Sequence, residues 1–334
     1  MSILSTKNLS KSFMVKIKKP GFKESLKSIF SPVMSEVNAV SNVSLNVDEG
    51  EAVAFIGPNG AGKSTTIKML TGILVPTSGD ISVLGLCPYK DRVKLSYKIG
   101  TVFGQKSQLW FHLPAHDTFD LMADIYEIDR VEYKYRLKRI IADFQLEEIM
   151  NIPVRKLSLG QRIRCEIAVS ILHEPKILFL DEPTIGLDVV VKNQIRELIH
   201  DMNRKTGMTV FLTSHDVGDI EKLCKRILII DKGKVILEST TYRLKHEFLK
   251  KKVLSLKLDS EYIPQHDGIS VLKSKGTGLK LSVDTSKVQI QYVIQNILSR
   301  TGIQDMNISD TPMEDVIRKI YTGDDSDGQT QEVL

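Results

Sequence analysis

Cysteine is scarce in this chain of 334 residues, and the few cysteines form no pattern. Cys87, Cys165 and Cys224 are odd in number and far apart, so they indicate neither a disulfide framework nor a set of metal ligands. Proteins whose thiols stay unpaired are typical of reducing compartments. We therefore expect this protein to work in the cytosol.

Long apolar runs are also missing. No stretch reaches the roughly 20 consecutive apolar residues of a membrane-spanning helix. The opening residues, MSILSTKNLSKSF, lack the apolar centre of a signal peptide. If the protein acts at a membrane, we expect another chain to cross it. The net charge of +5 excludes little, because it suits a nucleotide, a nucleic acid or an anionic membrane surface.

Apolar strands alternate with helical periodicity through most of the chain. The runs AVAFIG (52–57), KILFLDEP (176–183) and TVFLTSH (209–215) are predicted as buried strands, with helices over 115–150 and 158–173. This alternation predicts an α/β fold with a mostly parallel sheet covered by helices. In such sheets the ligand binds beyond the carboxyl ends of the strands.

The stretch 14–36 after the first predicted strand (1–13) has the character of a basic insert. Its apolar residues recur at helical spacing, which predicts a helix. Two interpretations remain open: a surface helix packed on its own domain, or a helix that contacts anionic lipid or a membrane partner. The residues behind both are Lys16, Lys18, Lys19, Lys23 and Lys27, with Phe22, Leu26, Ile29 and Phe30.

A second unit is expected over residues 250–322. The runs VLSLKL, ISVLKS and LKLSVD predict short strands, and a helix is expected from Gln289 to Arg300. A last helix begins at Thr311, with Pro312 in its first turn and Glu314 completing a capping box. We predict a small α+β domain here, followed by a disordered polar tail at 323–334.

A phosphate-binding loop follows the strand AVAFIG. The segment GPNGAGKS fits the pattern G-x-x-x-x-G-K-[ST], with a strand before it and a helix after it. Its glycines let backbone N–H groups face phosphates, its lysine places a charge near the β- and γ-phosphates, and its serine offers a hydroxyl to Mg²⁺. The predicted nucleotide-binding residues are Gly57, Pro58, Asn59, Gly60, Ala61, Gly62, Lys63, Ser64 and Thr65.

Polar residues end three other strands. Asp181 is the predicted Mg²⁺ partner, and Glu182 is placed to direct an attacking water. Alone, this acidic pair would also fit a helix cap, but the phosphate loop favours the catalytic interpretation. His215 is predicted to contact the γ-phosphate, whereas Gln105 carries little information by itself.

The order of these motifs, GPNGAGKST, VFGQ, LSLGQR, ILFLDEP, IGLD and TSH, resembles the nucleotide-binding subunit of an ABC transporter over about residues 1–240. The fold class implied is a P-loop ATPase with a mostly parallel sheet, an antiparallel β subdomain and a helical subdomain at about 105–175. The ATP-binding domain would span 1–245. ATP and Mg²⁺ are the implied cofactors.

The resemblance implies that two chains dock head to tail, each holding one side of every ATP. Ser158, Gly160 and Gln161 of the LSLGQ segment (157–161) would then meet the γ-phosphate held by the partner's phosphate loop, and Asp188 would face the partner. Leu159 stands where the family's commonest form has glycine. An ordinary helix cap is the alternative role for this segment.

The resemblance assigns further roles to two residues. Gln105 would contact Mg²⁺ and the water and link the site to the helical subdomain, and Phe13 would stack on adenine. The 14–36 insert separates Phe13 from the sheet.

The closest resemblance within the family is to type-two bacterial exporters near sodium- and drug-export ATPases. It implies an integral-membrane permease as partner, a homodimer, no nucleic acid, and a peripheral position on the cytoplasmic face of the membrane. Trp110 and Phe111 lie where relatives meet the permease, with core packing as the alternative. A soluble ABC ATPase that acts on ribosomes or nucleic acid is the alternative function.

Overall fold

The computed structural model describes residues 2–17, 33–104, 107–248 and 251–310. The chain divides into two compact units, Met1–Ser239 and Thr240–Leu334, and each is described by itself. The break falls six residues before the predicted end of the ATP-binding domain at 245. The helix predicted within 14–36, the helix predicted from Thr311 and the residue Gln105 lie outside the described residues.

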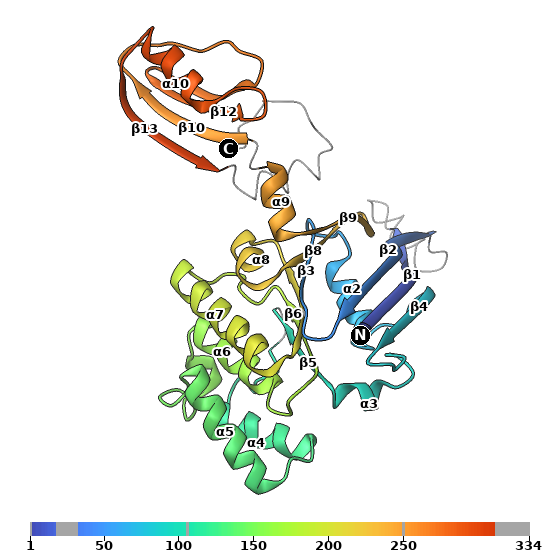
Figure 1. Cartoon of the computed structure of the whole chain (residues 1–334). Helices are drawn as coiled ribbons and strands as arrows, with labels where there is room; N and C mark the ends of the chain where they lie inside the picture. The colour runs from blue at the N-terminus through green and yellow to red at the C-terminus, as the bar shows by residue number, and fades with distance from the viewer. Residues whose placement is uncertain (1, 18–32, 105–106, 249–250, 311–334) are drawn as a thin grey trace, which may run out of the picture. The chain divides into compact units, whose positions relative to one another are not determined.

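A six-stranded sheet of order β5-β6-β7-β3-β8-β9 forms the centre of the larger unit (Figure 1). The pairs β3–β7, β3–β8, β5–β6 and β6–β7 are all parallel. Its strand β7 is buried over its whole length, and β3, β6 and β8 are buried except at one or both ends, as expected of a sheet covered on both faces. The strands are β3 (Ala52–Ile56), β5 (Ile99–Phe103), β6 (Ile177–Asp181), β7 (Thr209–Ser214), β8 (Arg226–Asp231) and β9 (Lys234–Thr240).

A three-stranded antiparallel sheet of order β2-β1-β4 accompanies the parallel one. It consists of β1 (Ser2–Ile17), β2 (Val33–Asp48) and β4 (Ser78–Val83). Helix α2 (Lys63–Leu70) lies between the two sheets (Figure 1), and its Ile67, Met69 and Leu70 belong to a core that draws residues from both.

The strands β1 and β2 correct the predicted limits of the insert. We expected a strand to end at 13, but the β1–β2 pairing continues through Phe13–Val37 and Val15–Ser35 to Ile17–Val33. The residues involved are mainly β-branched or long side chains that fit an antiparallel ladder.

The helices of residues 115–206 gather in the lower left of Figure 1. Asp129 caps α5 by accepting hydrogen bonds from two backbone N–H groups of the first turn, as its position before an amphipathic run favours. The elements are α3 (Arg92–Ser96), α4 (Ala115–Ile125), α5 (Arg130–Phe144), the 3₁₀ turn η1 (Val154–Lys156), α6 (Leu159–Ser170), α7 (Val189–Thr206) and α8 (Val217–Leu223).

The smaller unit contains a four-stranded antiparallel sheet of order β11-β12-β10-β13. Leucine and valine side chains of β10 and β12 pack with Val293 and Ile297 of α10 in a separate core. The strand β13 was not predicted, because its sequence IQDMNISD shows no strong apolar alternation. The elements are α9 (Thr241–Phe248), β10 (Lys251–Leu258), β11 (Ile269–Lys275), β12 (Gly278–Asp284), α10 (Ile290–Leu298) and β13 (Ile303–Asp310).

The predicted fold class is confirmed: a mostly parallel sheet, an antiparallel sheet and a helical region make up the larger unit. The domain limits remain a prediction. None of the helices in the described ranges has the length and apolar character that a bilayer crossing requires.

Candidate functional site

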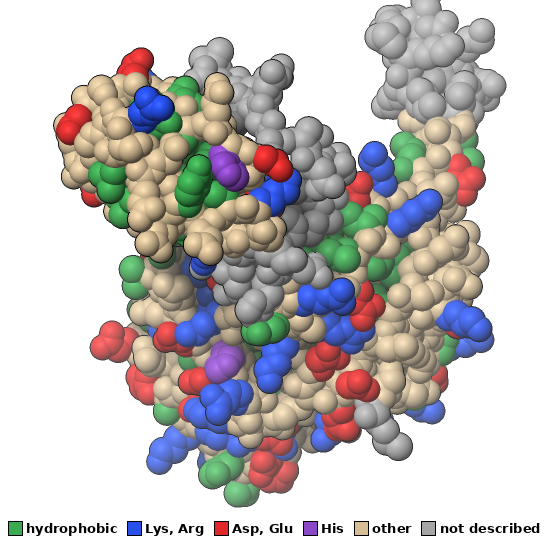
Figure 2. All heavy atoms as spheres, turned by 45° about the horizontal axis from the view of Figure 1, so that its top comes forward, with side chains coloured by type: hydrophobic (Ala, Val, Ile, Leu, Met, Phe, Trp, Pro, Cys, Tyr) green, Lys and Arg blue, Asp and Glu red, His purple; other side chains and the backbone are tan. Residues whose placement is uncertain are grey.

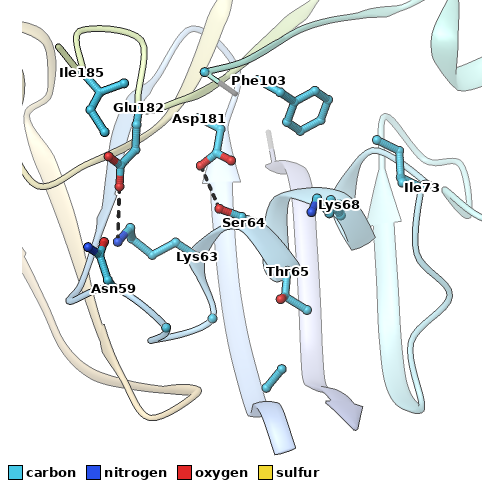
Figure 3. Close-up of a pocket in the computed structure, with 14 residues that line it drawn as sticks. Asn59, Lys63, Ser64, Thr65, Lys68, Ile73, Phe103, Asp181, Glu182 and Ile185 are labelled. Carbon is cyan, nitrogen blue, oxygen red and sulfur yellow. Dashed lines mark hydrogen bonds and ion pairs between the residues drawn. The ribbon is translucent and has the colours of Figure 1, made fainter. Parts of the chain in front are cut away.

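The loop between β3 and α2 forms one wall of a pocket of about 460 Å³ at the carboxyl ends of the parallel strands (Figure 3). Asn59, Gly60 and Gly62 of the loop line it, together with the first residues of α2. A second wall comes from the ends of β5 and β6, including Asp181 and Glu182. The topology thus brings together motifs that lie more than a hundred residues apart in the sequence.

The first turn of α2 is open to an anion. Gly62 precedes it at φ 106°, and no side chain caps it. The N–H groups of Lys63, Ser64 and Thr65 have no acceptor within the described ranges of the chain. Three N–H groups pointing along the axis at a helix N-terminus, where the helix dipole is positive, suit a phosphate group.

Lys63 is buried between the phosphate loop and the acidic end of β6. Its Nζ donates to Gly57 O at 2.7 Å and to Pro58 O at 3.3 Å, and lies 3.5 Å from Glu182 Oε1 (Figure 3). These contacts hold the ammonium group at the centre of the site, where it can offset phosphate charge.

Asp181 and Ser64 offer oxygen atoms side by side. Asp181 Oδ1 accepts hydrogen bonds from Ser64 Oγ at 3.2 Å (Figure 3) and from Thr213 Oγ1 at 2.5 Å. A carboxylate and a hydroxyl are hard oxygen donors of the kind Mg²⁺ prefers, and Mg²⁺ at a phosphate site takes its remaining ligands from phosphates and water. Within the described ranges, no group of three or more His, Cys, Asp or Glu side chains is arranged to hold a metal ion by itself.

Glu182 lies between two basic groups in a strained conformation. Its Oε2 lies 2.8 Å from His215 Nδ1, and its Oε1 lies 3.5 Å from Lys63 Nζ. Its φ of 54° is in the left-handed region, which is unfavourable for a residue with a side chain. A hydrogen bond from Glu182 N to Thr213 O, 3.0 Å long, helps to hold that conformation. Such strain persists where surrounding structure fixes a side chain, as at active sites.

The LSLGQ segment lies outside this pocket, at the N-terminus of α6. Ser158 Oγ accepts from Gln161 N at 3.2 Å, and Gln161 Oε1 accepts from Ser158 N at 2.9 Å, which completes a capping box. Gly160 is needed for packing, because a Cβ at this position would approach Val191 Cγ1 to 2.5 Å. Asp188 caps α7 alongside, accepting from Val190 N and Val191 N at 3.0 Å.

Comparison with known proteins identifies this arrangement. A family model described as ABC transporter matches residues 40–185. The ABC transporter ATP-binding protein NatA of Bacillus subtilis is 34% identical over 200 residues, which cover 60% of this chain and 81% of NatA. This chain belongs to the family of ABC transporter ATP-binding proteins.

Other relatives and solved structures agree with this assignment. The linearmycin resistance ATP-binding protein LnrL of Bacillus subtilis is 37% identical; the match covers 60% of this chain and 64% of LnrL. The bacitracin transport ATP-binding protein BcrA of Bacillus licheniformis is 34% identical with the same two coverages. A dimeric ATP-binding cassette, MJ0796 bound to ADP and Pi, is 28% identical with a TM-score of 0.59, covering 71% of this chain and 98% of that one.

The chain is therefore an ABC ATPase, which binds ATP and couples its hydrolysis to transport. The predicted family and enzymatic class are confirmed. The roles of individual site residues remain predictions, and the structure brings some of them together and separates others. Lys63, Ser64, Asp181 and Glu182 line one pocket, and His215 contacts Glu182 beside it.

The remaining predicted residues differ in position. Ser158, Gly160, Gln161 and Asp188 form a separate group at the N-termini of α6 and α7 and do not line the pocket. Phe13 on β1 is 37% exposed, has Lys11 Nζ 5.2 Å from its ring centroid, and does not line the pocket either.

Four polar residues that the sequence analysis did not single out connect the loop after β6 with the end of β7. Asp219 on α8 is fully buried and accepts hydrogen bonds from Thr184 Oγ1 and Ser214 Oγ, both at 2.6 Å, and from Arg196 Nε at 2.7 Å. Thr184 lies in the loop after β6 and Ser214 ends β7, so this carboxylate joins the loop of the predicted base to that of the predicted histidine. These four residue types are common in helices and loops, so no local sequence pattern predicts the hydrogen bonds among them.

Proposed function

We propose that this chain is the motor subunit of a membrane exporter and hydrolyses ATP–Mg²⁺ at an interface between two copies. The observation that carries the proposal is the contact series Lys63–Glu182–His215 beside the open N-terminus of α2. It puts a carboxylate with a basic neighbour on each side next to a phosphate site, which is the arrangement that phosphoryl transfer to water requires.

Substrate binding would use the phosphate loop in its ordinary way. The N–H groups of α2 and Lys63 Nζ would hold the β- and γ-phosphates, and Ser64 and Asp181 would hold Mg²⁺. The ion would supply neutralisation of the phosphate charge. Glu182 would accept a proton from the attacking water, and His215 would orient Glu182 and contact the γ-phosphate.

A second copy of the chain would complete each site. The LSLGQ segment does not line its own chain's pocket, and its Ser158 hydroxyl hydrogen and the N–H groups of Leu159 and Gly160 have no acceptor in the described part of the chain. These donors suit the γ-phosphate of an ATP held by the partner. Loss of that phosphate would remove the bridge and let the dimer open.

A permease and the export direction are inferred from exposed aromatics and from relatives. Trp110 and Phe111 are 51% and 49% exposed, which favours a partner surface over core packing. The names of BcrA and LnrL, with their reference to bacitracin transport and linearmycin resistance, support removal of a toxic compound from the cell. The protein would then lie on the cytoplasmic face of the membrane.

The alternative, an ATPase that acts on ribosomes or nucleic acid, has less support. Nucleic-acid sites are marked by clustered lysine and arginine. On the face shown in Figure 2, basic and acidic side chains are interspersed among neutral ones in the described residues.

The proposal is tested with Glu182→Gln, which keeps the size of the side chain and removes the proton acceptor. Hydrolysis should fall by about 10²–10⁴-fold while ATP binding is kept, and the variant should accumulate as an ATP-bound dimer in size-exclusion chromatography. The tagged protein, solubilised with its membranes in detergent, should retain a polytopic membrane protein.

Two results would count against the proposal. Normal turnover by the variant would remove Glu182 from its role. Recovery of the tagged protein with ribosomes or nucleic acid instead of a membrane protein would keep the ATPase and overturn the exporter.

A further inference from the structure

A buried carboxylate on α6 has no part in the site described above. Glu166 lies two turns after Ser158 and is 4% exposed. A carboxylate taken out of water is unfavourable unless it is well hydrogen-bonded. Burial raises the pKa of Glu166, against the opposing effect of its hydrogen bonds. Its position therefore needs an explanation from its partners.

The partners of Glu166 belong to another part of the chain. Ser107 Oγ donates to Glu166 Oε1, and Gln108 N donates to Glu166 Oε2 at 3.0 Å. The Gln108 side chain donates in turn to Thr101 O of β5. The segment after β5 is thus fixed to the sheet on one side and to α6 on the other.

The same segment is also hydrogen-bonded to η1, the 3₁₀ turn that precedes α6. Phe111 O accepts from Arg155 N at 2.9 Å, and Leu113 O accepts from Val154 N at 3.0 Å. Val154 and Arg155 belong to η1, which ends directly before the LSLGQ segment. Trp110 and Phe111, the exposed aromatics, therefore lie in a stretch that is bonded to α6 at Ser107 and Gln108 and to η1 at Phe111 and Leu113.

We propose that Glu166 is a positioning residue that joins α6 to the segment Ser107–Phe111 as one mechanical unit. A displacement of Trp110 and Phe111 by a membrane partner then moves Ser158 against the ATP of the second copy. This inference rests on the proposed function, since it needs the LSLGQ segment to meet a partner's nucleotide and the aromatics to meet a permease.

The test compares Glu166→Ala with Glu166→Gln in the purified full chain. Alanine removes both hydrogen bonds. The glutamine amide preserves both, because its oxygen accepts from Gln108 N while its NH₂ donates to Ser107 Oγ. Ser170→Ala is the matched control: Ser170 is a buried polar residue of the same helix, but its hydroxyl donates only to Ile167 O within α6, at 2.7 Å.

Two readouts separate positioning from simple destabilisation. In ATP hydrolysis, Glu166→Ala should lower kcat about tenfold with KM changed by less than about twofold, because the phosphate loop is untouched. In hydrogen exchange, protection should fall together at 107–113 and 157–162. Glu166→Gln and Ser170→Ala should match the wild type in both readouts.

The proposal is overturned if exchange rises at 107–113 while 157–162 and kcat stay unchanged, or if Ser170→Ala has the same effects as Glu166→Ala. If Glu166→Ala does not fold, Ser107→Ala is the substitute, because Ser107 is exposed and its loss removes one of the two hydrogen bonds to Glu166. Protection from hydrogen exchange should again fall together at 107–113 and 157–162, but by less. If the wild type hydrolyses no ATP, the proposed function fails, and the exchange result still decides whether the two segments are joined.

Discussion

Helices α2 and α6 both begin beside glycine and serine, yet their first turns are built in opposite ways. In α2 the residue before the helix is Gly62, no side chain caps it, and the first-turn N–H groups point into the pocket region. In α6 the Ser158 and Gln161 side chains satisfy each other's backbone N–H groups. Among the described residues, the two turns therefore leave different numbers of backbone N–H groups without an acceptor: those of Lys63, Ser64 and Thr65 in α2, and those of Leu159 and Gly160 in α6.

The difference agrees with the proposed roles, in which α2 forms a nucleotide site and α6 completes the site of a second copy. The α2 turn has Lys63 at its centre and the carboxylates of β6 facing it, so it can hold a nucleotide by itself. The α6 turn is already stable on its own, and only a few donors remain. It suits a phosphate that another chain presents.

Disrupting the uncapped first turn of α2 should have the largest effect, a loss of ATP affinity. A Cβ at Gly62 would lie 2.4 Å from Ala39 O, at a φ of 106° that disfavours side chains. Gly62→Ala must therefore move the loop or β2 at Ala39, and we expect ATP affinity to fall by about a hundredfold, or about 3 kcal/mol. Equilibrium binding of a fluorescent ATP analogue would measure it.

The opposite end of α2 supplies the control for that variant. Gly72 has a φ of 74°, and a Cβ there would lie 2.3 Å from Pro88 O, outside the pocket. Gly72→Ala should destabilise the fold to a similar degree but leave the ATP affinity of the folded protein unchanged. If both variants lose affinity equally, the open turn has no special role in binding.

A negative charge at the capped first turn of α6 should have the next largest effect, a slower hydrolysis of ATP. Aspartate is as good a helix cap as serine, so Ser158→Asp should change the free energy of unfolding by less than about 0.5 kcal/mol, whereas Ser158→Ala should cost about 1 kcal/mol. The added negative charge would face the partner's γ-phosphate, and hydrolysis should fall about tenfold. Urea denaturation and steady-state ATPase assays separate the two effects.

The two Ser158 variants distinguish the two roles of the LSLGQ segment. A pure helix cap would give lower stability for alanine and normal hydrolysis for aspartate. If Ser158→Asp is as stable as the wild type but hydrolyses ATP about tenfold more slowly, contact between Ser158 and the nucleotide of a second chain is supported.

The same contrast shows what the sequence could and could not predict. The placement of Lys63, Asp181 and His215 at one edge was predictable, because Lys63 belongs to the loop motif after β3, Asp181 ends β6 and His215 follows β7, and parallel strands bring their ends to one edge. Asp219 and Glu166 were not, because a buried carboxylate on a helix is recognised only from partners such as Arg196 or Gln108, which come from distant segments.

The smallest predicted effect is a pH dependence of stability, and it comes from His173 after the C-terminus of α6. His173 follows the helix and stacks on Tyr126, with 3.8 Å between the ring centroids. Burial lowers the pKa of His173 from 6.5 to about 4, so the ring does not easily accept a proton. Its Nε2 lies 3.0 Å from Ile99 O, and among the described residues its buried Nδ1 has no hydrogen-bond partner. The folded protein thus keeps His173 neutral.

Acid should therefore weaken the fold through this histidine. Below pH 6.5 the unfolded chain binds a proton that the folded chain refuses until pH about 4, so stability falls as the pH decreases through that window. Between pH 7 and pH 6 the loss from His173 should be about 0.7 kcal/mol. Urea denaturation at both pH values measures it, with His173→Phe as the control that keeps a ring on Tyr126 but cannot titrate. An equal loss in the wild type and in the phenylalanine variant would show that His173 is not the titrating group, whereas a smaller loss in the variant would assign the acid sensitivity to the end of α6.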